Sequence, residues 1–190
     1  LENAVVRYTV SGEVPRPLGT AHPSITPFQA FPTRDGWIVT PIGSPKLWER
    51  FCTVMGRCDL IADPRFSDNP ARTAHRRELV EILTRELCQR TTREWLELFD
   101  AEGIPCSPVN NVREICEDPH IAYRRMLVEI DQPGVGPMRI AGSPIHLSET
   151  PGSVRAGAPR LGEHTEDVLR QVLGMSAQEI ARLREQGVVG

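Results

Sequence analysis

Histidine, cysteine and serine residues are the first candidates for chemistry in this 190-residue sequence. Its five histidines include no i, i+4 pair and its five cysteines include no Cys-x-x-Cys, so we expect no metal site. No Gly-x-Ser-x-Gly turn is present to expose a serine nucleophile. Cys106 lies between two prolines that could hold a reactive thiol, although a buried structural cysteine is the more frequent case. The residues by themselves therefore indicate no self-contained active site.

Two glycine-containing segments, residues 18–23 and 42–45, could present backbone N–H groups to an anion. The second lies immediately before a predicted helix N-terminus, where such groups have no partner within the helix. A linker turn and an ordinary helix cap explain the two segments more simply. The residues of interest in them are Gly19, Thr20, His22, Gly43 and Ser44.

The elements next to these segments are a hairpin and a helix. A β-hairpin is predicted over residues 28–42, because β-forming residues flank the turn signal Asp35-Gly36. Ser44 is expected to cap a helix with Pro45 in its first turn and an apolar stripe that ends at Met55.

Further helices and strands are expected along the chain, and the predicted fold class is therefore α+β. The helices are predicted over residues 1–10, 71–90, 91–103, 111–116, 118–125, 162–173 and 176–187, extended chain over 104–109, and strands over 127–130 and 138–140. Trp37, Trp48 and Trp95 are all interpreted as core residues.

Two proline-rich segments divide the chain into three parts. Residues 1–24 would be a helix end and a linker, residues 25–140 a small α+β domain, and residues 141–190 a linker followed by helices. The helical ends are too short to bury their own apolar faces, so we expect both to dock on a domain outside this sequence. The first residue is Leu rather than Met, which is a further hint of a longer protein.

Composition and charge exclude several classes of protein. With 39% apolar and 25% charged residues, the chain resembles ordinary globular proteins. A net charge of −3 leaves no basic footprint for nucleic acid, and no apolar stretch approaches the ~20 residues of a membrane span. The odd number of cysteines argues against a disulfide scaffold, so we expect a reduced, cytoplasmic protein.

An ordered series of short blocks carries a family resemblance. The most specific block is residues 19–38, with Pro27, Gln29, Phe31, Thr33, Asp35 and Gly36 at a recognisable spacing. Others are Trp48-Glu-Arg-Phe-Cys52, Asp63-Pro-Arg-Phe66 with Asn69 and Arg72, Glu94-Trp95, Gly103-Ile-Pro-Cys-Ser-Pro-Val-Asn110, Asp118-Pro-His120, Gly142-Ser-Pro-Ile145 and Leu161-Gly-Glu-His-Thr165. Together they resemble the C-terminal portion of family III CoA-transferases, the group of formyl-CoA transferase, carnitine CoA-transferase ("carnitine dehydratase") and α-methylacyl-CoA racemase.

The resemblance implies a longer enzyme than this chain. Members of the family have a large Rossmann-like domain, built from the N-terminal half and the extreme C-terminus, and a small α+β domain inserted between two linkers. Two such chains interlock. The implied partners of this chain are therefore the N-terminal half of the same enzyme and a second copy in an interlocked homodimer.

The resemblance also implies a reaction, in which an acyl-CoA passes its CoA to a carboxylic acid acceptor through an aspartyl-CoA thioester. The CoA thioester is a substrate, and no permanently bound cofactor is implied. The Asp belongs to the family's N-terminal half, and no Asp here aligns with it, so no catalytic residue is assigned. The implied rim of the substrate and CoA site is Gly19, Thr20, His22, Phe28, Gly43 and Ser44.

Two alternatives stay open. The chain could be a non-catalytic interaction module or a truncated relic of the family. It could also belong to the racemase branch, which places a Glu where this chain has Ser44 and tends to have a Tyr in place of Gln29. Both differences favour transfer, because a serine hydroxyl is a poor base at neutral pH. The acyl donor and the acceptor acid are not assigned.

Overall fold

The computed structural model describes residues 2–189, and the chain divides into two compact units after Val109. Small antiparallel sheets and short helices make up both units, which confirms the predicted α+β class. The expected domain boundaries at residues 24/25 and 140/141 stay predictions.

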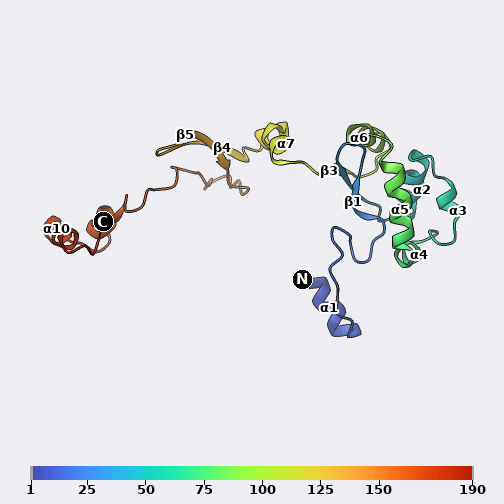
Figure 1. The fold of residues 1–190 in the computed structure, drawn as a ribbon, viewed down its shortest axis with the longest axis horizontal. Helices are drawn as coiled ribbons and strands as arrows, with labels where there is room; N and C mark the ends of the chain where they lie inside the picture. Colours follow the sequence, from blue (N-terminus) through green and yellow to red (C-terminus); the bar gives the residue numbers. More distant parts are fainter. Residues whose placement is uncertain (1, 190) are drawn as a thin grey trace. The chain divides into compact units, whose positions relative to one another are not determined.

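The sheet of the first unit contains the predicted hairpin. Strands β1 (Phe28–Pro32) and β2 (Trp37–Pro41) pair antiparallel, and β3 (Ser107–Pro108) pairs with the other edge of β2. The turn signal at Asp35-Gly36 thus lies in the turn that joins β1 to β2. Figure 1 labels β1 and β3 of this sheet.

Five helices of the first unit accompany this sheet, and side chains cap several of them as the sequence predicts. They are α2 (Pro45–Val54), α3 (Asp59–Ala62), α4 (Asn69–Ala74), α5 (Arg76–Leu87) and α6 (Thr92–Ala101). Ser44 Oγ accepts the backbone N–H of Leu47 at 3.3 Å, and Thr91 and Glu94 form a reciprocal capping box.

The single helix expected over residues 71–90 is two helices in the structure. His75 separates α4 from α5 and leaves helical geometry, with φ −100° and ψ 25°. On either side of it, Arg72 donates a hydrogen bond to the carbonyl of Thr26 and Arg76 to that of His22, which lie 46 and 54 residues away in the sequence. Because these are tertiary contacts, the local hydrophobic pattern of residues 71–90 could not indicate the break.

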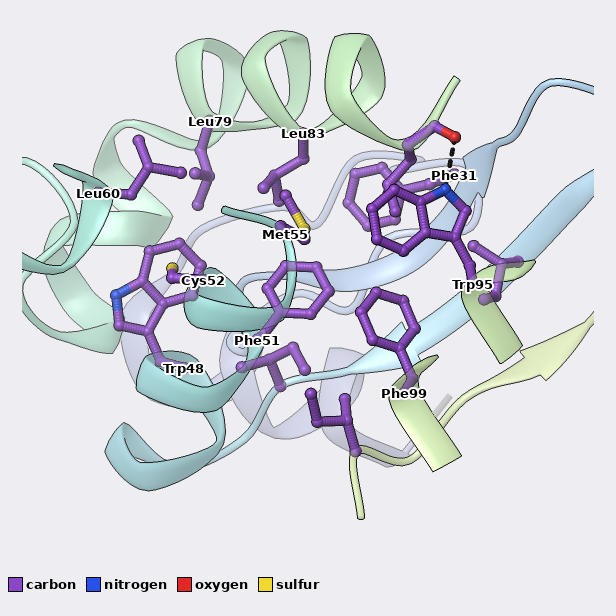
Figure 2. Close-up of a cluster of buried hydrophobic side chains, with 14 of the residues drawn as sticks. Phe31, Trp48, Phe51, Cys52, Met55, Leu60, Leu79, Leu83, Trp95 and Phe99 are labelled. Carbon is purple, nitrogen blue, oxygen red and sulfur yellow. Dashed lines mark hydrogen bonds between the residues drawn. The ribbon is translucent and has the colours of Figure 1, made fainter. Parts of the chain in front are cut away.

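The hydrophobic core of the first unit lies between the hairpin and helices α2, α5 and α6 (Figure 2). Phe51 packs on Phe99 with ring centroids 5.3 Å apart, and Trp95 Nε1 donates to the carbonyl of Leu87 at 2.7 Å. The fully buried members include Phe31, Ile38, Ile42, Phe51, Cys52, Phe66, Leu79, Leu83, Leu87 and Phe99.

The prediction that all three tryptophans belong to this core is wrong for one of them. Trp48 and Trp95 are buried, but Trp37 is 50% exposed. In β2 the buried residues are Ile38 and Thr40, and a strand alternates its faces with period two. Trp37 therefore points to the opposite face from the core.

The chain before the hairpin is a helix and an irregular segment. Helix α1 (Glu2–Ser11) ends at Gly12, whose φ of 73° is left-handed. The expected helix began at Leu1, which lies outside the described residues. Val5, Val6, Tyr8 and Val10 are exposed.

The second unit contains α7 (Val112–Glu117), α8 (Pro119–Tyr123), β4 (Leu127–Gln132), β5 (Gly136–Ala141), α9 (Thr165–Gln171) and α10 (Ala177–Glu185). The predicted strands are confirmed as the antiparallel pair β4 and β5. The proline- and glycine-rich residues between β5 and α9 form no regular element, and the Gln132 side chain holds the backbone of Ala158 through hydrogen bonds of 2.8 and 2.9 Å. Among residues 2–189, no helix has the length and hydropathy that crossing a membrane requires.

Candidate functional site

The first predicted segment, around Gly19, folds back on strand β1. Gly19 adopts a φ of 61°, and the N–H of Ala21 donates to the carbonyl of Leu18 at 3.1 Å, which closes a tight turn. Thr20 Oγ1 then accepts the N–H of Ala30 at 3.1 Å. The turn is therefore fixed to the edge of β1.

His22 is the most constrained side chain of this segment. Its N–H donates to the carbonyl of Phe28 at 2.8 Å, and its ring lies parallel to the Phe28 ring at 5.2 Å between centroids. Its Nδ1 accepts the N–H groups of Ile25 at 3.1 Å and Ser24 at 3.2 Å. An Nδ1 that accepts hydrogen bonds assigns the proton of the neutral imidazole to Nε2, which can then donate to a ligand.

Three polar side chains from α4 and α5 hold the segment between His22 and β1. Asn69 accepts the N–H of Thr26 at 2.9 Å and donates to the carbonyl of Ser24 at 2.7 Å. Arg72 Nε donates to the carbonyl of Thr26 at 2.7 Å, and Arg76 Nη2 donates to the carbonyl of His22 at 2.9 Å. We call these three residues, Asn69, Arg72 and Arg76, the loop anchor.

Sequence reasoning assigned no role to the loop anchor. The sequence marks Asn69 and Arg72 only as members of a block that matches the family, and no pattern marks Arg76. The available signal was the i, i+3 spacing of Asn69 and Arg72, which places both on one helical face. Nothing local indicated which segment that face would contact.

The second predicted segment leads into α2. The N–H of Ile42 donates to the carbonyl of Pro27 at 2.9 Å, so this segment and the start of β1 lie together at the open end of the hairpin. Gly43 is exposed, and a Cβ built on it would meet nothing within 4 Å. Ser44 Oγ is occupied as the α2 cap. Gly43 and Ser44 therefore precede a helix N-terminus on an accessible surface.

The charges around the loop anchor include the two arginines and the carboxylate of Asp68, which precedes Asn69 and acts on Arg72. Burial lowers the pKa of both Arg72 and Arg76, because desolvation disfavours the charged form. Their acceptors near His22 are carbonyl and hydroxyl oxygens. The anchor is thus a structural device that orders backbone.

Cys106 has little of the character of a reactive thiol. It is half-buried against the core, and burial followed by the charge of Asp100 raises its pKa. A raised pKa reduces the thiolate fraction at neutral pH. Among the described residues, no group of three or more His, Cys, Asp or Glu side chains is placed to hold a metal ion.

The structure places the six predicted rim residues along β1 and just after the end of β2. Residues 19–22 contact β1 at Phe28 and Ala30, and residues 43–44 follow directly after β2. The chemistry available there is hydrogen-bond donation from backbone N–H groups and from His22. Their role as the rim of a substrate site stays a prediction.

The fold and the candidate site together define a small α+β unit that offers hydrogen-bond donors to a ligand. The sequence profile of CoA-transferase family III matches residues 1–165, and the chain belongs to that family.

Curated relatives are CoA-transferases. The chain is 31% identical over its whole length to human succinyl-CoA:glutarate CoA-transferase, of which it covers 43%. It is 39% identical over 166 residues to the beta subunit of succinyl-CoA–L-malate CoA-transferase from Chloroflexus aurantiacus. That match covers 86% of this chain and 41% of the relative. The chain thus spans less than half the length of these relatives.

A solved structure shows the same fold. A CAIB/BAIF family protein from Brucella suis superposes with a TM-score of 0.73 at 29% identity, over 90% of this chain and 44% of that one. The family resemblance is therefore confirmed, whereas the narrower subgroup of formyl-CoA transferase, carnitine CoA-transferase and the racemase stays a prediction.

Proposed function

We propose that this chain is the C-terminal part of an acyl-CoA:carboxylate CoA-transferase. The observation that supports the proposal is that two donor-bearing segments lie beside the start of β1: the N–H of His22 bonds the carbonyl of Phe28, and the N–H of Ile42, next to Gly43, bonds the carbonyl of Pro27. Backbone N–H groups and His22 Nε2 would there stabilise negative charge on an oxygen of the acyl group. The nucleophilic Asp would come from polypeptide outside this sequence.

The proposed reaction proceeds by covalent exchange. The Asp carboxylate attacks the thioester carbonyl, which gives a mixed anhydride and the CoA thiolate. The thiolate attacks the aspartyl carbonyl, which releases the donor acid and leaves an aspartyl-CoA thioester. The acceptor carboxylate then attacks that thioester, and the released thiolate takes the acceptor's acyl group, which regenerates the Asp.

The substrates we propose are dicarboxylic acids and their CoA thioesters. Several relatives are named for succinyl-CoA as donor, and for glutarate, L-malate or mesaconate as the second acid. Succinyl-CoA and glutarate are therefore the first pair to test. We further propose an interlocked homodimer, as the resemblance implies, and a cytoplasmic location, as the odd number of cysteines indicates.

Ser44 favours transfer over racemisation. Its Oγ accepts a hydrogen bond from Leu47 as the α2 cap, and a hydroxyl cannot replace the carboxylate base that proton abstraction at neutral pH requires.

The test uses the complete enzyme, in which this chain is joined to or combined with the half that supplies the Asp. Succinyl-CoA and glutarate are mixed, and glutaryl-CoA is followed by mass spectrometry. Formation of glutaryl-CoA without net hydrolysis supports the proposal. Exchange of a substrate α-proton with deuterium, without CoA transfer, would support the racemase instead. Absence of both reactions with a panel of acyl-CoA substrates would favour the interaction module.

A further inference from the structure

Arg76 connects helix α5 to the segment that contains His22. Its Nη2 donates to the carbonyls of His22 at 2.9 Å and Pro23 at 3.2 Å, and to Thr26 Oγ1 at 3.1 Å. Its Nε reaches the same Thr26 Oγ1 at 3.3 Å. Within the described part of the chain, all hydrogen bonds of this guanidinium go to residues 22–26. Arg76 therefore contributes to the order of this segment rather than to the hydrophobic core.

Arg72 differs from Arg76 in this respect, whereas Asn69 bonds Ser24 and Thr26 of the same segment. Arg72 is 1% exposed, bonds the carbonyl of Phe66 as well as that of Thr26, and places its guanidinium 4.8 Å from the centroid of the Trp48 ring. Its loss would disturb the core and the segment together. Of the three anchor residues, Arg76 is the one that bonds the carbonyl of His22, and its effect on the segment can be separated from folding.

His22 is held from several sides, and Arg76 supplies one of them. The N–H and the ring of His22 contact Phe28, and the His22 Nδ1 accepts the N–H of Ile25. The carbonyl of His22 accepts a hydrogen bond from Arg76. The ring atom left to donate is Nε2. A shift of the backbone at His22 and Pro23 would therefore move this donor directly.

The planar guanidinium of Arg76 is suited to holding several acceptors of one segment at once. It presents several N–H donors in a fixed fork, so one group can hold two successive carbonyls and a hydroxyl at once. A lysine ammonium in the same place offers a single nitrogen on a flexible stem, and it would hold fewer of these acceptors.

We propose that Arg76 is a positioning residue, which fixes His22 so that its Nε2–H donates to an oxygen of the bound acyl group. This proposal rests on the proposed function of the site. His22 is the group that touches the substrate, and Arg76 acts only through it.

The test compares Arg76→Gln and Arg76→Lys with the matched control Arg77→Gln. Arg77 follows Arg76 on α5, but its side chain is 93% exposed and forms an ion pair with Glu81 at 3.9 Å. The first readout is amide hydrogen exchange at residues 22–28 of this chain, with the amides of β2 as internal reference. We expect Arg76→Gln to raise exchange at Ile25 and Thr26 by about tenfold or more, and Arg77→Gln to leave it unchanged.

The second readout is steady-state kinetics of the complete enzyme with succinyl-CoA and glutarate. We expect Arg76→Gln to lower kcat about tenfold with KM changed by less than about threefold, since the lost interaction strengthens in the transition state. Arg76→Lys should restore part of kcat. In a His22→Ala background, Arg76→Gln should cause no further loss, because a residue that acts through His22 has nothing left to position.

Unchanged amide exchange at Ile25 and Thr26 in Arg76→Gln would overturn the proposal. It would also be overturned if the kcat losses of His22→Ala and Arg76→Gln multiplied in the variant that carries both substitutions. Faster exchange with unchanged kcat would also overturn it, since the segment would then be ordered for another reason. If the unaltered enzyme transfers no CoA, the proposed function fails on that result alone. The exchange measurement still decides whether Arg76 anchors His22.

Discussion

Arg72 places a guanidinium in the core of the first unit, where a charged group is costly unless its donors are used. The structure satisfies it with the carbonyls of Thr26 and Phe66 and with the face of Trp48. These two acceptors are neutral carbonyl oxygens. Through its contacts with Thr26, Phe66 and Trp48, the Arg72 guanidinium links three separate segments of the chain.

Replacing Arg72 by Met is therefore expected to destabilise the chain strongly. The two carbonyls lose their donor within the protein, and we expect the free energy of unfolding to fall by about 3 kcal/mol. Urea unfolding followed by tryptophan fluorescence measures it. The control Arg77→Met should stay within about 0.5 kcal/mol of the unaltered chain. Equal stability of the two variants would contradict this account of Arg72.

The cysteines are expected to differ widely in reactivity. Burial raises the pKa of Cys52 to about 12, so its thiol stays protonated at neutral and mildly alkaline pH, whereas Cys58 and Cys88 are exposed. Iodoacetamide at pH 8 should label Cys58 and Cys88 in the native chain, and Cys52 only after denaturation. Peptide mass spectrometry identifies the labelled cysteines. Labelling of Cys52 in the native chain at a rate similar to that of Cys58 and Cys88 would show that the core opens.

At the scale of elements, a polar contact joins the hairpin tip to helix α6. The Asp35 carboxylate accepts the N–H of Thr92 at 2.8 Å and its hydroxyl at 3.1 Å, and Thr33 Oγ1 lies 2.7 Å from the same hydroxyl. A Cβ at Gly36 would approach Thr92 Oγ1 to 2.9 Å, so glycine is needed for this close contact.

This contact predicts a pH dependence. The hydrogen bond from the Thr92 backbone is the main cause that lowers the pKa of Asp35 below its ordinary 3.8. A carboxyl whose pKa is lower in the folded than in the unfolded state stabilises the fold, and this contribution is complete at pH values above the unfolded pKa. The contribution is lost as the pH falls through the folded pKa. Asp35→Ala should thus lower the melting temperature at pH 7, and the difference should shrink below about pH 4. A difference that stays constant down to pH 2 would contradict the assignment.

The Ser44 cap predicts a stability change in α2. Ser44→Ala removes the acceptor for the N–H of Leu47 and should cost about 1 kcal/mol in the free energy of unfolding. Ser44→Asp keeps an acceptor at this position and should recover most of the loss. Equal destabilisation by both substitutions would indicate that Ser44 acts through a contact other than the cap.

At the scale of the whole molecule, the hydrophobic core cluster lies entirely within the first of the two units. Its members run from Phe31 to Ile104, and the three tryptophans are in the same unit. We expect a chain truncated after Val109 to keep a cooperative unfolding transition, with a free energy within about 0.5 kcal/mol of the full chain. Loss of that transition in urea, followed by tryptophan fluorescence, would mean that the second unit is needed for the core.

Local features were predictable from the sequence because they depend on neighbouring residues. The hairpin follows from β-forming residues on both sides of Asp35-Gly36, and the capping boxes at Thr91 and Ser176 follow from a Glu three residues later. The family also follows from the order and spacing of short blocks, as its profile match confirms. For the candidate site, the sequence indicated both segments but not what holds them.

The tertiary structure alone decided the break at His75, the exposure of Trp37 and the loop anchor. Arg72 and Arg76 reach residues 46 and 54 positions away, and no local pattern reports such contacts. The sequence by itself determined which segments form strands, turns and capped helices, because those depend on interactions over a few residues. Only the folded chain decided which polar side chains order His22, because buried donors take the carbonyls that the fold places within their reach.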